Sequence, residues 1–433
     1  MNNIVGYRKW IYIILISLCV FHGLIIHLWN YAYLDLYIVD YALSYLIITF
    51  FILHYIFKSG ILSLEFLFNI FGLLYSNYHI AQFVYINQHI PERIGFAMFL
   101  SHLSIIVFNF SFLLFSCKKQ SKKATVKKNV NIDSQNKLLT LLLLLCIATE
   151  FYVIFEQIGV VEYFIAERAE KALMMDGYSR LTYYKFAIPI ISIISLFNYF
   201  SEKRKYSLLL FFISFAIAMF NSILSASRAE MISLFLPILF LLRYFKMIND
   251  KLVTIFGLFA IILFGAWKAL FSGEFEVSFD SEFNTWYNIC DNVLRTNDYT
   301  LLYGKSYLVT LYNCIIPFTD SHTLSTWYLE KYEWDVLVRG GGRGFSAVLE
   351  AYMNFGFFGI FIVYGFYGWL ISRLNTKSSF NIIVYIIVMT SLFQFFRSES
   401  YSLWKNMMWF KIYPLVFIFF FSSKPNKSNK ALI

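Results

Sequence analysis

The stretch that most constrains this chain is Arg339-Gly-Gly-Gly-Arg343-Gly-Phe-Ser-Ala-Val-Leu-Glu350-Ala-Tyr-Met-Asn354-Phe-Gly356. Three consecutive glycines allow backbone conformations that other residues resist, and helical spacing follows them. One helical face carries the polar residues Arg343, Ser346, Glu350 and Asn354. The other face is apolar and carries Phe345, Val348, Leu349, Tyr352 and Phe355. The sequence therefore predicts a loop followed by an amphipathic helix.

The start of this helix is suited to binding an anion. A helix N-terminus offers unpaired N–H groups and the positive end of the helix dipole, and Arg339 and Arg343 stand close to it. A guanidinium group binds phosphate through parallel hydrogen bonds. We predict that Arg339, Gly341, Gly342, Arg343 and Asn354 bind a phosphate or pyrophosphate group. The alternative is a solvated loop followed by an ordinary amphipathic helix.

Composition indicates a membrane protein. Of the 433 residues, 59% are hydrophobic, 21% are aromatic and only 14% are charged. The apolar runs are long enough to cross a bilayer, and they are continuous rather than alternating, which favours helices over a barrel. We predict an all-α polytopic membrane protein with about twelve transmembrane helices. The expected spans are 10–29, 36–57, 61–83, 95–116, 138–158, 183–200, 207–226, 229–245, 252–272, 355–372, 380–396 and 408–423.

The basic residues predict the orientation of the chain. With both termini in the cytoplasm, every cytoplasmic connection carries Lys or Arg, as the positive-inside rule requires. The net charge of +10 follows from this bias and gives no reason to invoke nucleic acid. We expect five parts: a four-span part (1–116), a basic cytoplasmic linker lying on anionic lipids (117–137), a five-span part (138–272), a long periplasmic loop (273–354), and a three-span part with a basic tail (355–433).

The long outward loop is the segment most suited to carry function, because long loops in compact proteins are usually functional. It contains five aromatic residues that could stack on sugar rings: Trp286, Tyr287, Trp327, Tyr328 and Trp334. The same residues could instead form an interfacial belt. The sequence leaves both interpretations open.

Three further charged sites are expected at outward ends of spans. They are Arg228 with Glu230, Arg397 with Glu399, and a loop cluster that includes Arg168 and Arg180. A charge near mid-span costs about 2.5–3.5 kcal/mol and usually marks function. Snorkelling arginines or local ion pairs are the alternative for each site. Because every cluster on this side contains arginine, we predict that they bind a shared anionic ligand.

Other chemistries find no support in the sequence. The histidines do not have metal-ligand spacing, and the phosphate-binding loops of nucleotide enzymes are missing. We therefore expect no metal and no cofactor. Among the five cysteines, only Cys290 and Cys314 could meet in an oxidising compartment.

Two stretches resemble a known family. They are Ser227-Arg228-Ala229-Glu230 and Gly341-Gly-Arg343-Gly-Phe-Ser-x-x-x-Glu350-x-Tyr-x-Asn-Phe-Gly356-x-x-Gly359. Both are similar to the oligosaccharide repeat-unit polymerases of the O-antigen polymerase (Wzy-type) family, as is the twelve-span layout with its long outward loop. The resemblance implies a bacterial inner-membrane glycosyltransferase that acts at the periplasmic face. It would transfer a growing glycan from undecaprenyl pyrophosphate to another lipid-linked unit, with membrane lipids and a chain-length regulator protein as further partners.

The predicted chemistry assigns two roles to the charged side chains. The departing pyrophosphate would be stabilised without metal by arginines, principally Arg228, Arg339, Arg343 and Arg397. The attacking sugar hydroxyl needs a base, and a half-buried carboxylate can have a raised pKa. Glu350 is the first candidate for this base, and Glu230 and Glu399 are the others. The main alternative function is a lipid-linked oligosaccharide flippase, and a membrane anchor or interaction protein is a third.

Overall fold

A computed structural model describes residues 34–86, 92–116, 130–159, 161–162, 174, 187–224, 228–257, 259, 280–296, 300–316, 321–338 and 344–423. The first expected span, 10–29, lies outside these residues, as does most of the ninth, 252–272. In the described residues every regular element is helical, and the only extended pairing is a single bridge between Val130 and Ser423. The predicted all-helical class is confirmed for this part of the chain.

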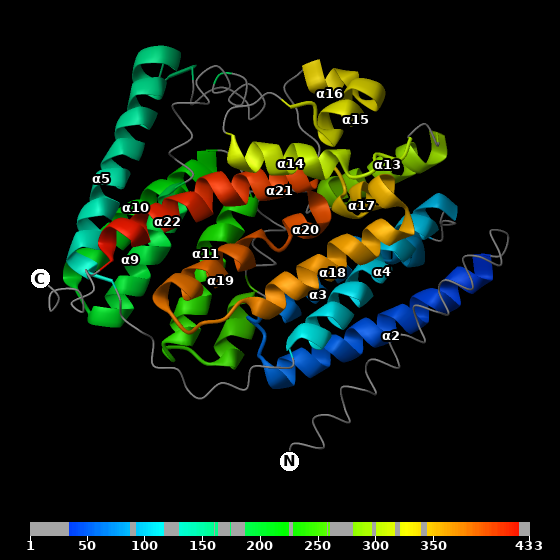
Figure 1. The fold of residues 1–433 in the computed structure, drawn as a ribbon, viewed down its shortest axis with the longest axis horizontal. Helices are drawn as coiled ribbons and strands as arrows, with labels where there is room; N and C mark the ends of the chain where they lie inside the picture. The colour runs from blue at the N-terminus through cyan, green and yellow to red at the C-terminus, as the bar shows by residue number, and fades with distance from the viewer. Residues whose placement is uncertain are drawn as a thin grey trace, which may run out of the picture.

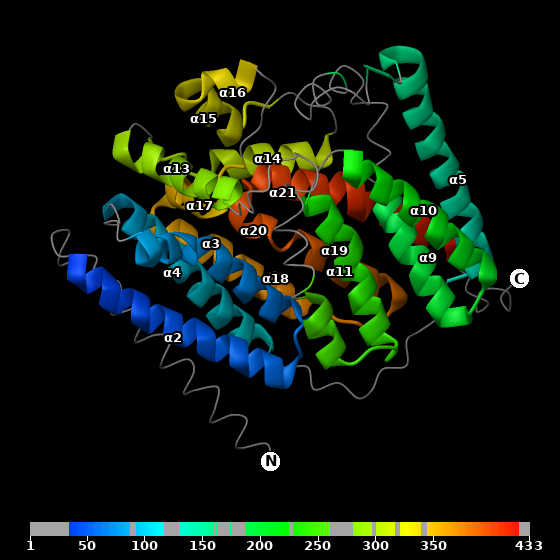
Figure 2. The ribbon, with the colours of Figure 1, turned by 180° about the vertical axis from the view of Figure 1, so that it is seen from behind.

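The apolar helices form two groups with a pair of helices between them (Figures 1 and 2). One group contains α2 (Leu34–Lys58), α3 (Leu64–Ile86), α4 (Glu92–Phe115) and α18 (Phe357–Arg373). The other contains α5 (Ile132–Phe151), which continues as the π-helical segment η2 (Tyr152–Ile158), α9 (Ile188–Glu202) and α10 (Lys205–Leu224). Between the groups lie α11 (Arg228–Tyr244) and α19 (Ser379–Ser391), which pack against each other.

A layer of shorter helices covers the end of the bundle where α18 begins. It consists of α13 (Asp280–Thr296), α14 (Lys305–Ile315), α15 (Leu324–Tyr332), α16 (Trp334–Val338) and α17 (Ala347–Phe355). In both views α14 lies alongside α21 (Ser400–Met407), which continues through the π-helical turn η4 (Met408–Ile412) into α22 (Tyr413–Ser422). The segment 273–354, predicted as a long connection between spans that ends in a Gly/Arg-rich loop and an amphipathic helix, is mostly helical where it is described.

Three of the described helices are long and apolar enough to cross a membrane, and they comprise residues Gly95–Phe115, Ile132–Ile158 and Lys205–Ile223. Five shorter apolar helices accompany them in the described part of the chain. The number of spans, their orientation and the five-part division stay predictions. Cys290 and Cys314 are both free and buried, so neither forms the disulfide that the sequence allowed.

The chain between α19 and α21 differs from the expected spans. α19 ends at Ser391 and not near 396, and the short helix α20 (Gln394–Arg397) follows it. The last helix begins at Ser400, eight residues before the expected start of the span at 408. The physical reason is that Ser400 is bound at the N-terminus of α21 by Glu350, whose carboxylate accepts a hydrogen bond from the Ser400 backbone N–H at 2.6 Å. A long-range contact thus decides where this helix begins.

Helices α4 and α18 approach so closely that a glycine is required at their contact. A Cβ atom added at Gly368 would lie 2.4 Å from the Phe108 carbonyl oxygen and 2.8 Å from the Ser111 Cβ. Backbone atoms cannot move aside as a flexible side chain can, so these two helices pack only with a hydrogen atom at this position.

We expect Gly368→Leu to lower the thermal stability of the protein in detergent by several degrees. Overpacking a core usually costs about 1–3 kcal/mol, and a clash with backbone falls at the upper end. The measurement is the midpoint of heat-induced loss of the monodisperse peak in size-exclusion chromatography. Gly257→Leu is the matched control, because an added Cβ at Gly257 meets nothing within 4 Å. Equal midpoints for the two variants would contradict the proposed close packing.

Candidate active site

The helix expected from the opening stretch is present and is buried on both faces. Ser346 caps α17, and its hydroxyl accepts a hydrogen bond from the Leu349 N–H at 3.1 Å. On the apolar face Phe345, Val348 and Leu349 are buried, and Tyr352 and Phe355 are half-buried. The polar face is buried too, because Glu350 is 1% exposed and Asn354 is 0% exposed. Such burial requires partners for the polar groups, and two other helices supply them.

Glu350 is held by serine side chains from α14 and α21. Its Oε1 atom accepts hydrogen bonds from the Ser306 and Ser400 hydroxyls, both at 2.6 Å. Its Oε2 atom accepts the Ser400 backbone N–H at 2.6 Å. The Ser400 hydroxyl also lies 3.0 Å from the Thr310 hydroxyl on α14. One carboxylate therefore links α17, α14 and the start of α21.

Asn354, one helical turn further on, fixes the other side of Ser306. Its Nδ2 group donates to the Ser306 Oγ at 2.8 Å and to the Glu350 carbonyl oxygen at 2.8 Å. Its Oδ1 atom accepts the Gly304 N–H at 3.0 Å, just before α14 begins. Gly304 has a φ of +85°, a conformation that suits glycine. Asn354 was predicted to bind a ligand, and the structure places it as a support for α14 and Ser306.

Burial changes the acid–base properties of Glu350. Loss of hydration raises the pKa of its carboxyl group from 4.5 to about 7, although the serine hydrogen bonds oppose this shift. Burial also raises the pKa of the neighbouring Tyr307 phenol, and the Glu350 charge adds to the effect. The Tyr307 hydroxyl is buried and has no hydrogen-bond partner within the described chain. Glu350 is thus poised to exchange a proton near neutral pH.

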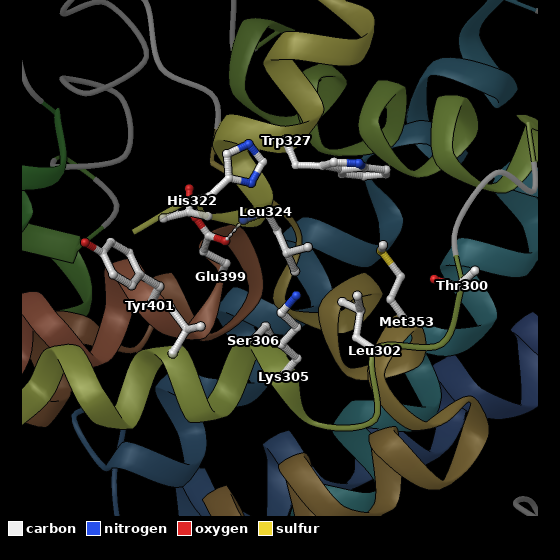
Figure 3. A pocket seen from close by; sticks show the side chains of 12 residues that line it. Thr300, Leu302, Lys305, Ser306, His322, Leu324, Trp327, Met353, Glu399 and Tyr401 are labelled. Carbon is white, nitrogen blue, oxygen red and sulfur yellow. Dashed lines mark hydrogen bonds between the residues drawn. The ribbon is translucent and has the colours of Figure 1, made fainter. Parts of the chain in front are cut away.

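A cavity of about 260 Å³ lies between α14, α15, α17 and α21, and Ser306 forms part of its wall (Figure 3). The indole of Trp327 covers one side of the cavity. The polar and charged residues of its lining are Thr300, Lys305, Ser306, His322, Thr323, Glu399 and Tyr401. Glu350 does not line the cavity and reaches it only through the Ser306 hydroxyl. This arrangement differs from the direct contact between Glu350 and a ligand that the helical spacing suggested.

Glu399, the second carboxylate of the site, lines the cavity and caps a helix. Its Oε2 atom accepts the Leu324 N–H at 2.8 Å and the Ser325 N–H at 3.3 Å, at the N-terminus of α15. It is 2% exposed, and burial is the main cause that raises its pKa. A carboxylate is favoured at this end of a helix by hydrogen bonding and by the helix dipole. Glu399 therefore holds α15 over the cavity.

Arg397, which belongs to the predicted cluster with Glu399, lies next to the end of the Gly/Arg-rich stretch. It ends α20 and packs against Gly344, where an added Cβ would lie 2.9 Å from the Arg397 carbonyl oxygen and 3.3 Å from its Cγ. Gly344 directly follows Arg343 in the chain. The two motifs predicted to share a ligand are therefore neighbours at this point.

The remaining predicted residues lie elsewhere or outside the described part. Glu230 lines a different cavity, between α9, α11, α19 and the end of α21, and not the cavity beside Glu350. The side chain of Arg228 is outside the described residues, although the residue begins α11. Six further predicted residues are wholly outside them: Arg168, Arg180, Arg339, Gly341, Gly342 and Arg343.

The aromatic residues of the outward segment divide into two kinds. Trp286 is 1% exposed and its indole N–H donates to the Phe396 carbonyl oxygen at 3.2 Å, so it belongs to the core. Tyr328 is 0% exposed and is equally inaccessible to a sugar. Trp327 lines the cavity, and its ring also contacts Phe345 and Tyr332. Trp334 is 59% exposed, and the side chain of Tyr287 lies outside the description.

Sequence reasoning missed the partners of Glu350. Ser306, Thr310 and Ser400 are small polar residues without a motif, and 44 and 50 residues separate Glu350 from the two serines that bind it. The sequence predicts no role for His322, which lines the cavity and whose ring lies 2.7 Å from a Glu330 carboxylate oxygen. The one local signal was Gly304-Lys305-Ser306, a glycine directly before a helix.

These features define a helical membrane protein with a buried acid–base site beside a small polar cavity. Residues 277–429 match the family model described as O-antigen polysaccharide polymerase Wzy, which confirms the family predicted from the motifs. The match contains Glu350, Asn354, Arg397 and Glu399, and it supports polymerisation of O-antigen repeat units from lipid-linked oligosaccharides at a membrane. Neither a curated protein nor a solved structure matches the chain.

Proposed function

We propose that the protein is a metal-independent glycosyltransferase that joins lipid-linked oligosaccharide repeat units at the periplasmic face of the bacterial inner membrane. The growing glycan would pass from undecaprenyl pyrophosphate to a sugar hydroxyl of the next unit. The observation that carries this proposal is the buried Glu350 carboxylate, linked through the Ser306 hydroxyl to a cavity in the part of the chain that matches the polymerase family.

The hydrogen bonds around Ser306 support a proton relay. The Ser306 hydroxyl donates to Glu350 Oε1, and its oxygen accepts from Asn354. A hydroxyl oxygen has two lone pairs, so one remains for a substrate hydroxyl in the cavity. As the acceptor oxygen attacks the anomeric carbon, its proton passes to Ser306 while the Ser306 proton passes to Glu350. The bond between the anomeric carbon and the pyrophosphate oxygen breaks, and the leaving group departs with the electron pair.

Departure of the pyrophosphate depends mainly on positive charge placed near its oxygens. Lipid pyrophosphate is already a good leaving group, so the protein must mainly stabilise its developing charge. Arg397 and the Gly/Arg stretch, which meet at Gly344, are the proposed arginine contribution. Trp327 and Tyr401 on the cavity wall are placed to pack against a sugar ring of the acceptor.

A gene deletion separates this function from a flippase. We expect the deletion strain to carry single, unpolymerised repeat units on the final acceptor, because the units are still exported. A plasmid copy of the gene should restore long chains. The measurement is the ladder of glycan lengths on an electrophoresis gel. Loss of all surface units, with lipid-linked oligosaccharide retained on the cytoplasmic side, would instead identify a flippase.

A further inference from the structure

A second polar cavity, of about 290 Å³, lies within the bundle itself. It is formed by α9, α11, α19, α20 and the helix that runs from α21 into η4. Its polar lining consists of Glu230, Ser233, Thr390, Gln394, Asn406 and Lys411. So many polar groups among apolar helices are costly to maintain and usually serve a ligand.

Lys411 is held by two hydroxyl groups, and no salt bridge joins it to an acidic side chain among the described residues. Its Nζ group donates to the Thr390 hydroxyl oxygen at 3.2 Å and to the Ser391 hydroxyl oxygen at 3.1 Å. Both hydroxyls donate their own protons to the Ile387 carbonyl oxygen, at 2.9 and 3.0 Å, so their lone pairs face the ammonium group. An ammonium has three N–H donors, and the two hydroxyls use only two of them.

Helix α21 connects this cavity to the one beside Glu350. Tyr401, near its start, lines the first cavity, and Asn406 and Met407, at its end, line the second. Five residues of helix rise about 8 Å. A diphosphate with its first sugar is of similar length, so one substrate can reach from the bundle cavity toward the first cavity.

We propose that the bundle cavity binds the diphosphate of a polyprenyl-linked sugar, with Lys411 as its cationic ligand. The Gln394 and Asn406 amides offer further donors to the phosphate oxygens. The Glu230 carboxylate only accepts hydrogen bonds when ionised, so it fits the hydroxyl groups of the sugar and not the phosphates. This inference rests on the proposed function, because it places the diphosphate of the acceptor unit of that reaction, whose sugar hydroxyl would extend toward Ser306, whereas the departing diphosphate of the donor stays with the arginines near Gly344.

Direct binding tests the proposal without requiring turnover. The full-length protein, purified in detergent, is titrated with farnesyl pyrophosphate, and farnesol and inorganic pyrophosphate serve as separate arms. We expect Lys411→Met to weaken farnesyl pyrophosphate binding tenfold or more, because a charge-assisted hydrogen bond is lost. Lys411→Arg should retain most of the affinity. Glu230→Gln should leave the affinity unchanged or raise it, because a negative charge is removed. Lys205→Met, at an exposed position that begins α10, is the charge-matched control.

The difference between the two effects makes the test decisive, because only Lys411→Met is expected to weaken binding. Unchanged binding by Lys411→Met, or an equal loss in Lys411→Met and Glu230→Gln, would overturn the proposal. Equal binding of inorganic pyrophosphate and farnesyl pyrophosphate would overturn the assignment to a lipid-borne ligand. Binding of farnesyl pyrophosphate can depend on Lys411 even if deletion of the gene leaves the glycan chain length normal. That pair of results would refute the proposed polymerase function but would support the proposed binding site.

Discussion

Replacement of Glu350 by Gln is expected to reduce polymer formation at least a hundredfold. Gln keeps the shape of the side chain, but it cannot take a proton, and removal of a general base typically costs a factor of about 10²–10⁴. The variant should still be folded, because the amide oxygen can accept from Ser306 or Ser400. The measurement is the glycan length distribution made by membranes that contain equal amounts of each protein. Asp335→Asn, an exposed carboxylate change on α16, is the matched control.

The pH dependence provides a second readout for Glu350. Because burial raises the pKa of this carboxyl from 4.5 to about 7, the basic form accumulates as the pH rises through 7. Activity should therefore rise with pH up to about that value. The stability contribution runs in the opposite direction: the folded state favours the protonated carboxyl, so stability falls as the pH rises from about 4.5 to 7. Glu350→Gln should remove both the rise of activity with pH and the fall of stability with pH. Near-normal polymer from this variant would transfer the role of base to Glu230 or Glu399.

Replacement of Glu399 by Ala is expected to lower activity about tenfold and to reduce thermal stability. The change leaves the Leu324 and Ser325 N–H groups at the start of α15 without their acceptor, and each unsatisfied group costs about 1–3 kcal/mol. Helix α15 carries Trp327, so its displacement would alter the cavity wall. The measurements are polymer yield and the melting midpoint in detergent.

The comparison with Glu399→Gln distinguishes a positioning role from catalysis. The amide oxygen of Gln can still accept a hydrogen bond from the Leu324 N–H. Glu399→Gln should therefore retain most of the activity and the thermal stability that Glu399→Ala loses. Equal inactivity of the Gln and Ala variants, with normal stability of the Gln variant, would show that the Glu399 charge takes part in the reaction.

Several properties of this protein follow from its sequence alone. Apolar composition and continuous hydrophobic runs determine an all-helical membrane protein, because only helices satisfy the backbone within such runs. The spacing of Glu350 and Asn354 places them on one helical face, and the structure confirms that both belong to α17. The resemblance to the O-antigen polymerase family is also visible in local motifs, and the Gly/Arg motif with Glu350 lies within the matched residues 277–429. All of these are short-range features, which a reader of the sequence can recognise without knowing what packs against what.

Only the tertiary structure decides what these residues do. Nothing near Glu350 in the chain indicates that Ser306 and Ser400 will bind its carboxylate, that Glu399 will cap α15, or that Lys411 will meet Thr390 across the bundle. The same contacts bury the polar face of α17 and move the start of the last helix to Ser400. Helical periodicity identifies which side chains share a face, whereas their partners and pKa values depend on helices that are distant in sequence and adjacent in space.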